Sequence, residues 1–191
     1  MKLLPLLPVL LLASCSTLRD YVPGGGDLRE RAALNLGQRV FSDHSANWLD
    51  EQPNAGIEYS LWREDGAFGY DFGLNYHRDR ITMPVFGNTV MRGWEATAGL
   101  RRTFEIEGLP FTPYIGAGVT GWWADRDEEN NTARDGEESG AGVYERFGAT
   151  MNLSDHAYIG LDVRYSQEDF IQGGNLNMDG DVVSLTLGVI I

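Results

Sequence analysis

The stretch AFGYDFGLNYH, residues 67–77, alternates between two classes of side chain without interruption. From residue 68 on, aromatic and aliphatic residues occupy the even-numbered positions, whereas glycine, aspartate, asparagine and histidine occupy the odd-numbered ones. We call each of these two sets of alternate positions a parity. A strict period of two is typical of a β-strand whose two faces contact different media. In a soluble sheet the bulky face is the core, but in a small transmembrane barrel the bulky face contacts lipid. Which of the two faces contacts water therefore decides between a soluble sheet and a transmembrane barrel.

The same two-faced pattern recurs along the chain, and no amphipathic helix interrupts it after the first residues. Eight antiparallel strands can close on themselves and leave no exposed edge. The sequence therefore predicts an all-β fold, an eight-stranded antiparallel up-and-down transmembrane β-barrel over residues 31–191. Its strands are expected at about residues 32–41, 53–63, 67–77, 89–104, 111–123, 141–153, 157–167 and 181–191.

The connections between these runs alternate in length. Those at 64–66, 105–110 and 154–156 are short, whereas the others are long and the longest is an acidic segment at 124–140. Short turns at one end and long loops at the other are typical of outer-membrane barrels, whose turns are periplasmic and whose loops are extracellular. This arrangement predicts that both termini lie on the periplasmic side.

Charge on the small-residue parity indicates which face is enclosed. Four acids and four arginines share that parity, and such balance suits a closed interior, where an unpaired charge is expensive. The opposite parity is expected to face lipid, with aromatic residues at the membrane interfaces. The predicted lumen network is Arg39, Glu58, Asp71, Glu95, Arg101, Arg146, Asp162 and Arg164. The predicted interfacial aromatics are Tyr59, Trp62, Tyr70, Tyr76, Trp94, Trp123 and Tyr165.

The first residues, MKLLPLLPVLLLASC, have a charged start, an apolar run and a small-residue end. This order is typical of a secretory signal peptide. Its ending, LASC, resembles the lipobox of bacterial lipoproteins, which implies cleavage after residue 14 and lipidation of Cys15. A chance thiol beside an ordinary cleavage site and a buried structural cysteine are the alternatives. Residues 15–30, which include three consecutive glycines, are expected to form a flexible tether.

Two segments carry a resemblance to a known family. PFTPYIGAGVTGWW (110–123) and NLSDHAYIGLDVRYS (152–166) resemble strands and a turn of the small outer-membrane β-barrel superfamily, which contains OmpA-like, OmpX-like and opacity-type barrels. The resemblance implies a barrel in the bacterial outer membrane, in contact with membrane lipid and lipopolysaccharide. It also implies that the barrel-assembly and lipoprotein-sorting machineries act on the chain during biogenesis.

The composition argues against nucleic acid as a partner, and the sequence shows no clear metal-binding or catalytic motif. The formal net charge of −13 argues against binding to nucleic acid, which selects for basic patches. Neither the acidic segment nor NLNMDGD (175–181) has the spacing of a calcium loop, so no metal and no cofactor is expected. Polar residues near loop ends match no catalytic motif, and no catalytic residue is predicted. Those considered are Asp43, His44, Ser45, His77, Ser166 and Glu168.

The resulting hypothesis is a non-enzymatic outer-membrane lipoprotein barrel with a role in envelope integrity or surface interaction. Eight strands enclose an interior that side chains fill, which argues against a wide pore. One alternative is an outer-membrane enzyme that modifies lipid A or phospholipid. Another is a periplasmic, lipocalin-like lipoprotein that holds a lipid among inward-facing aromatics.

Overall fold

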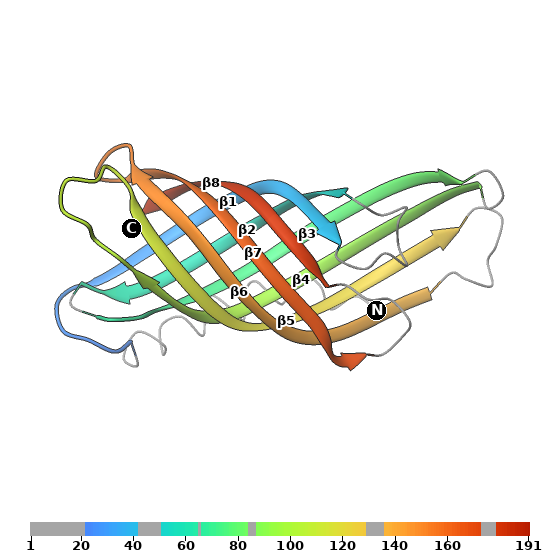
Figure 1. Cartoon of the computed structure of the whole chain (residues 1–191), viewed down its shortest axis with the longest axis horizontal. Coiled ribbons are helices and arrows are strands. Elements are labelled where there is room, and N and C mark those ends of the chain that lie inside the picture. Colours follow the sequence, from blue (N-terminus) through green and yellow to red (C-terminus); the bar gives the residue numbers. More distant parts are fainter. Residues whose placement is uncertain (1–21, 42–50, 65, 84–86, 129–135, 173–178) are drawn as a thin grey trace.

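The computed structural model describes residues 22–41, 51–64, 66–83, 87–128, 136–172 and 179–191. These residues form a closed barrel in which each strand pairs with the next and the last pairs with the first (Figure 1). This confirms the predicted fold class. No helix long and apolar enough to cross a membrane occurs in the described ranges. The strands are β1 (Leu28–Phe41), β2 (Glu51–Arg63), β3 (Gly69–Met83), β4 (Gly87–Thr103), β5 (Thr112–Glu128), β6 (Gly136–Asn152), β7 (Ala157–Gln172) and β8 (Gly180–Ile190).

The strand register fixes the width of the barrel. Following paired residues once around all eight strands leads from Arg31 back to Phe41, ten residues further along β1. A displacement of this kind tilts the strands against the barrel axis, and with eight strands the interior is just wide enough for side chains. The lumen is therefore a packed core.

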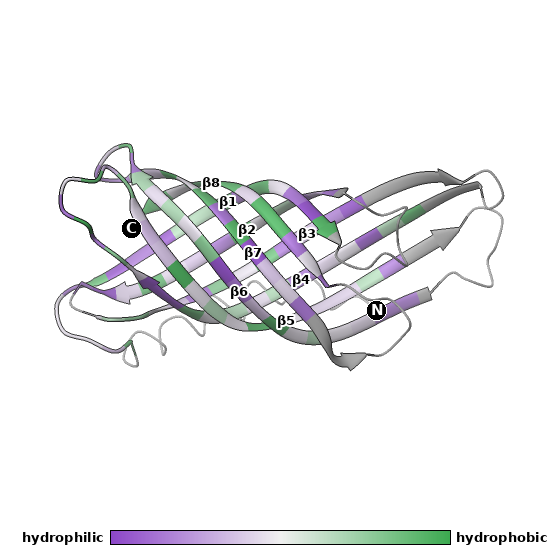
Figure 2. Ribbon diagram, in the orientation of Figure 1, coloured by the Kyte–Doolittle hydropathy of each residue, from purple (hydrophilic) through white to green (hydrophobic). Residues whose placement is uncertain are grey.

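The two parities separate as the sequence predicts. On β7, Asp162 and Arg164 are buried, whereas the intervening face carries Leu161, which is 57% exposed. Arg101 on β4 is likewise buried. Hydrophilic and hydrophobic residues alternate along the strands in Figure 2. The charged parity therefore faces the lumen and the bulky parity faces outward.

The barrel has two distinct ends. One end, here called the turn end, carries the connections from β2 to β3, from β4 to β5 and from β6 to β7. Both the start of β1 and the end of β8 also lie there, because Arg31 pairs with Ile190 (Figure 1). The opposite end is called the loop end. The connections thus alternate between the two ends as predicted, but the predicted difference in length is wrong for β3–β4, whose connection (84–86) is shorter than the β4–β5 connection (104–111).

Strands at the loop end extend further than the sequence predicts. Most of the segment expected as a loop, 124–140, belongs to strands, because β5 continues to Glu128 and β6 begins at Gly136. The backbone ladder continues beyond the point where one face meets lipid, so the hydrophobic alternation fades while the pairing persists. The resulting projecting sheet consists of residues 78–83, 87–92, 125–128 and 136–139 of β3, β4, β5 and β6.

The two outer edges of the projecting sheet lack strand neighbours among the described residues. Beyond His77, β3 pairs only with β4, and before Gly140, β6 pairs only with β5. Figure 1 shows these strand pairs extending well past the ends of β1 and β8. The barrel therefore carries a four-stranded platform on its loop end.

The start of the barrel also differs from expectation. β1 begins at Leu28, inside the segment predicted as a tether, and Val22 is buried. Arg63 at the β2–β3 turn donates hydrogen bonds from Nε to the Val22 carbonyl (3.1 Å) and from Nη1 to the Gly26 carbonyl (3.3 Å). At Gly24 φ is +122°, a region that favours glycine. Residues 22–27 therefore lie against the turn end.

Candidate functional site

Five charged side chains from five strands meet in the half of the lumen nearer the turn end. We call them the inner cluster: Glu58, Asp71, Arg101, Arg146 and Asp162. Arg101 pairs with Glu58 and, through Nε, with Asp71 at 2.8 Å. Arg146 reaches Glu58 at 2.7 Å, Asp162 at 2.9 Å and Asp71 at 3.3 Å. The planar guanidinium groups bridge the carboxylates that the strands bring together.

Tyr114 of β5 completes the inner cluster. Its hydroxyl donates a hydrogen bond of 2.6 Å to Asp162. Its ring lies 4.3 Å from the Arg101 guanidinium and 5.3 Å from that of Arg146, within the range of cation–π contact. Gly148 makes room for this ring, since a Cβ there would lie 2.4 Å from the Tyr114 hydroxyl.

A second group, the outer cluster, lies nearer the loop end and is formed by Arg39, Glu95, Thr120 and Arg164. Both arginines bind the same oxygen of Glu95, Arg39 at 2.9 Å and Arg164 at 2.6 Å. Thr120 donates to the other oxygen at 2.9 Å. Arg39 and Glu95 are fully buried, so the carboxylate is enclosed by its donors.

An aromatic cap lies at the turn end of the lumen. The Arg31 guanidinium sits 4.7 Å from the ring of Trp62 and 4.9 Å from the ring of Tyr158. Arg31 also donates to the Thr150 hydroxyl at 3.4 Å. The prediction that Trp62 belongs to an outward aromatic belt is therefore wrong, because its even position on β2 has the inward parity of Glu58.

All eight charged residues predicted for the lumen face inward, and the structure divides them between the two clusters. Cys15 lies outside the described residues. Arg31 and Tyr114 were not predicted, although both share the parity of their inward neighbours. The first expected strand begins at about residue 32, so the prediction leaves Arg31 out.

The polar residues considered for catalysis do not assemble at an outer rim. His77 and Ser166 are both fully buried on the lumen face. Asp43, His44 and Ser45 lie outside the described residues, as does the side chain of Glu168. Within the described ranges, no three His, Cys, Asp or Glu side chains are placed to hold a metal ion.

The outer surface is apolar and carries aromatic residues toward the loop end. Tyr76, Trp94 and Trp123 lie side by side on β3, β4 and β5, because they are register partners. Their ring centroids are 4.8 Å apart for the first pair and 6.4 Å for the second. Such a row of amphipathic rings is typical of a membrane interface.

The comparison with known families decides the assignment. The model of the family described as "Outer membrane protein beta-barrel domain" matches residues 6–190. The chain belongs to this family. Its apolar outer face and charged lumen are those of a barrel in the outer membrane.

Solved structures of outer-membrane barrels share the fold at low sequence identity. Neisserial surface protein A superposes with a TM-score of 0.60 at 14% identity, covering 86% of this chain and 96% of that one. OprG from Pseudomonas aeruginosa gives 0.62 at 16% identity, covering 89% and 98%. Ail, the attachment invasion locus protein of Yersinia pestis, gives 0.58 at 14% identity, covering 87% and 100%. No curated protein sequence matches the chain significantly.

Proposed function

We propose that this outer-membrane barrel is a lipid-anchored, non-enzymatic protein whose projecting sheet makes contacts at the cell surface. The observation that carries the proposal is the four-stranded platform, which continues past the aromatic row and whose β3 and β6 edges have no strand neighbour among the described residues. An unpaired strand edge offers backbone donors and acceptors to another chain. A barrel that only sealed its own lumen would have no need of this extension.

The lumen supports a structural rather than a transport or catalytic role. Its two charged clusters are bonded across the interior, and Arg146 alone joins acids from three other strands. His77 and Ser166 are enclosed on the same face, out of reach of a lipid substrate outside the barrel. If replacing His77 with alanine altered the lipid A mass profile of expressing cells, the enzymatic alternative would take precedence.

The lipocalin-like alternative requires an apolar lumen that could hold a lipid. The lumen instead encloses the ion pairs of the inner cluster, while the large aliphatic residues point outward. Leu161 and Phe147, for example, are more than half exposed. This orientation does not suit a carrier.

Lipidation of Cys15 and a periplasmic turn end are the remaining parts of the proposal. β1 starts and β8 ends at the turn end, so a lipid chain on Cys15 would enter the inner leaflet of the membrane that the barrel spans. A Cys15→Ser variant should lose incorporation of labelled palmitate yet stay in the outer-membrane fraction after an alkaline wash. Release of this variant into the soluble fraction would contradict a spanning barrel. Retained label would contradict the anchor.

The partners that we propose follow from the same orientation. The outer face would contact phospholipid and lipopolysaccharide, and the barrel-assembly and lipoprotein-sorting machineries would act during biogenesis. Cysteines introduced in the projecting sheet should react with an impermeant maleimide on intact cells. Labelling only after cell lysis would reverse the orientation.

The surface role can be tested by removing part of the projecting sheet. Asp125 and Glu137 are register partners, so residues 126–136 can be replaced by a two-residue turn without disturbing the barrel below. We expect cells with this variant to adhere less to one another and to an epithelial monolayer. The control is a Glu137→Gln, Glu138→Gln variant, which keeps the backbone of the sheet.

The folded state of both variants is checked by heat-modifiable migration on gels. Unchanged adherence of cells that carry the folded variant without residues 126–136 would refute the surface role. Sensitivity of the same cells to bile salts would then support the envelope-integrity role.

A further inference from the structure

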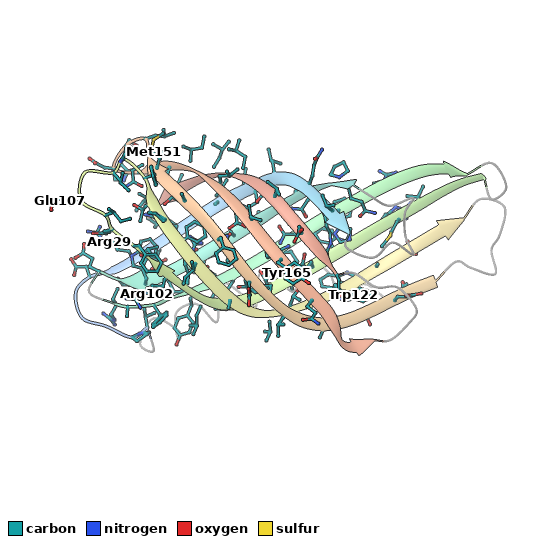
Figure 3. The ribbon with its side chains drawn as sticks, viewed as in Figure 1. Arg29, Arg102, Glu107, Trp122, Met151 and Tyr165 are labelled. Atoms are coloured by element: carbon teal, nitrogen blue, oxygen red, sulfur yellow. The ribbon has the colours of Figure 1, made fainter. Side chains whose placement is uncertain are left out.

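A small cavity lies between the aromatic cap and the inner cluster. Arg31 of the cap and Asp71 of the inner cluster both line it, and all of its lining residues belong to the described ranges. The centre of a water molecule can lie anywhere within about 20 Å³ of this cavity. About 10–15 Å³ on this measure is enough to hold one water molecule. The cavity is at the turn end, where Figure 3 labels the neighbouring side chains of Arg29 and Arg102.

Each of the two charged residues keeps one buried atom without a hydrogen-bond partner among the described residues. These atoms are Nε of Arg31, which is a donor, and Oδ1 of Asp71, which is an acceptor. The other groups of both residues are engaged. Nη1 of Arg31 donates to Thr150 at 3.4 Å, and Oδ2 of Asp71 accepts from Arg101 at 2.8 Å and Arg146 at 3.3 Å. Because buried polar atoms are almost always bonded to protein or to ordered water, this pair marks a binding site.

The strand register explains why the two side chains face a common space. Ser60 on β2 is the partner of Arg31 on one side and of Asp71 on the other. With neighbouring strands about 4.8 Å apart, the two residues lie about 10 Å apart across the lumen wall. The Arg31 guanidinium is held by the rings of Trp62 and Tyr158, at 4.7 and 4.9 Å. The cavity is the space that remains between this guanidinium and the carboxylate.

The charges at the cavity indicate the chemical class of its occupant. The inner cluster contains three acids and two arginines, so its formal charge is −1, and Arg31 adds one positive charge. A bound ion would disturb this balance, and an uncompensated charge in the interior is costly. A neutral molecule that both accepts and donates a hydrogen bond suits the two unpartnered atoms. At this volume that molecule is water.

We propose that one water molecule bound in this cavity joins Arg31 to Asp71. The water accepts a hydrogen bond from Nε of Arg31 and donates one to Oδ1 of Asp71. The hydroxyl group of Thr103, which also lines the cavity, is its third partner. Buried water molecules make about three hydrogen bonds of this kind. The aromatic cap and the inner cluster thereby become one neutral network of six charges, and a hydrated ion pair closes the turn end of the lumen.

The test detects this water molecule through the Nε proton of Arg31. The full chain is labelled with ¹⁵N-arginine in phospholipid nanodiscs, and the Arg31 signal is assigned by its loss in an Arg31→Met variant. We expect a rotating-frame Overhauser cross-peak between this proton and water. Its sign, opposite to that of the diagonal, distinguishes contact with a bound water from chemical exchange of the proton. An Nε signal without this cross-peak, or one that exchanges freely with solvent, would overturn the proposal.

Two variants at Thr103 then show whether the water lies in this cavity. Thr103→Val keeps the size of the side chain and removes the hydroxyl group, so the cross-peak should remain, because Arg31 and Asp71 are unchanged. Thr103→Leu also lacks the hydroxyl group but fills the cavity, and it should lower the cross-peak at least tenfold. Folding of both variants is confirmed by heat-modifiable migration. A cross-peak that persists in folded Thr103→Leu, or that is lost from both variants, would contradict the assignment.

Discussion

Removal of one arginine from the inner cluster tests whether the lumen charges hold the barrel together. Arg146 pairs with Glu58, Asp71 and Asp162, all of which are buried. An Arg146→Met change keeps much of the side-chain volume but leaves three carboxylates with Arg101 as the nearest cation. The formal charge of the cluster falls from −1 to −2.

The expected loss of stability follows from this imbalance. Breaking a buried ion pair by removing one partner costs about 3–5 kcal/mol, because the remaining charge is enclosed without compensation. We therefore expect Arg146→Met to lower the free energy of unfolding by about 4 kcal/mol. Adding Asp162→Asn restores the charge of the cluster to −1 and should recover about 2 kcal/mol of that loss.

The assay is equilibrium unfolding in urea with the barrel in phospholipid vesicles, followed by tryptophan fluorescence. Arg102→Met is the matched control, since Arg102 lies on the outer face of β4 and contacts the rings of Phe68 and Phe104 at 5.7 and 5.4 Å. That change should cost less than about 1 kcal/mol. The reasoning is refuted if Arg146→Met costs no more than the control, or if adding Asp162→Asn lowers stability further.

Two further changes probe packing outside and inside the barrel. Trp94→Ala removes the central ring of the Tyr76–Trp94–Trp123 row and should cost about 1–3 kcal/mol in the same urea assay, whereas Trp94→Phe should cost clearly less. Equal losses would show that ring contact is not the cause. Gly93→Ala would place a Cβ 1.9 Å from Nε2 of His77, so it should cost about 1–3 kcal/mol, and His77→Ala should relieve most of that loss in the double variant. If the losses of the two single variants simply add in the double variant, contact between the new Cβ and His77 is not the cause.

Most of the barrel could be predicted from alternation, because each strand has one face in lipid and one in the lumen. The parity rule placed Arg39 and Glu95 on the inside, although it could not predict that they bond each other. That contact depends on the stagger of the strands around the barrel, which brings Arg39 of β1 next to Glu95 of β4 across the interior. The local sequence does not reveal this stagger. Parity also predicts an inward Trp62, and only the aromatic character of the residue suggested an outward position.

The strand ends were the least predictable feature. Neither face of the projecting sheet contacts lipid, so nothing there requires apolar and polar residues to alternate. Asp125 and Glu128 have the composition of a loop yet lie in β5. Glu145 shows the opposite case. Its parity alone, opposite to that of Arg146, marks it as a carboxyl group on the lipid side.

The ten-residue stagger of the closed sheet bears on how such a chain can evolve. Insertion of a single residue within a strand would turn the rest of that strand inside out, carrying arginines such as Arg164 into hydrocarbon and leaving leucines in the polar interior. Insertion of two residues would keep the faces but break the match where β8 meets β1. Changes in chain length are therefore tolerated only beyond the membrane, which leaves the four-stranded platform and its connections as the region where lineages can diverge while the tube below is preserved.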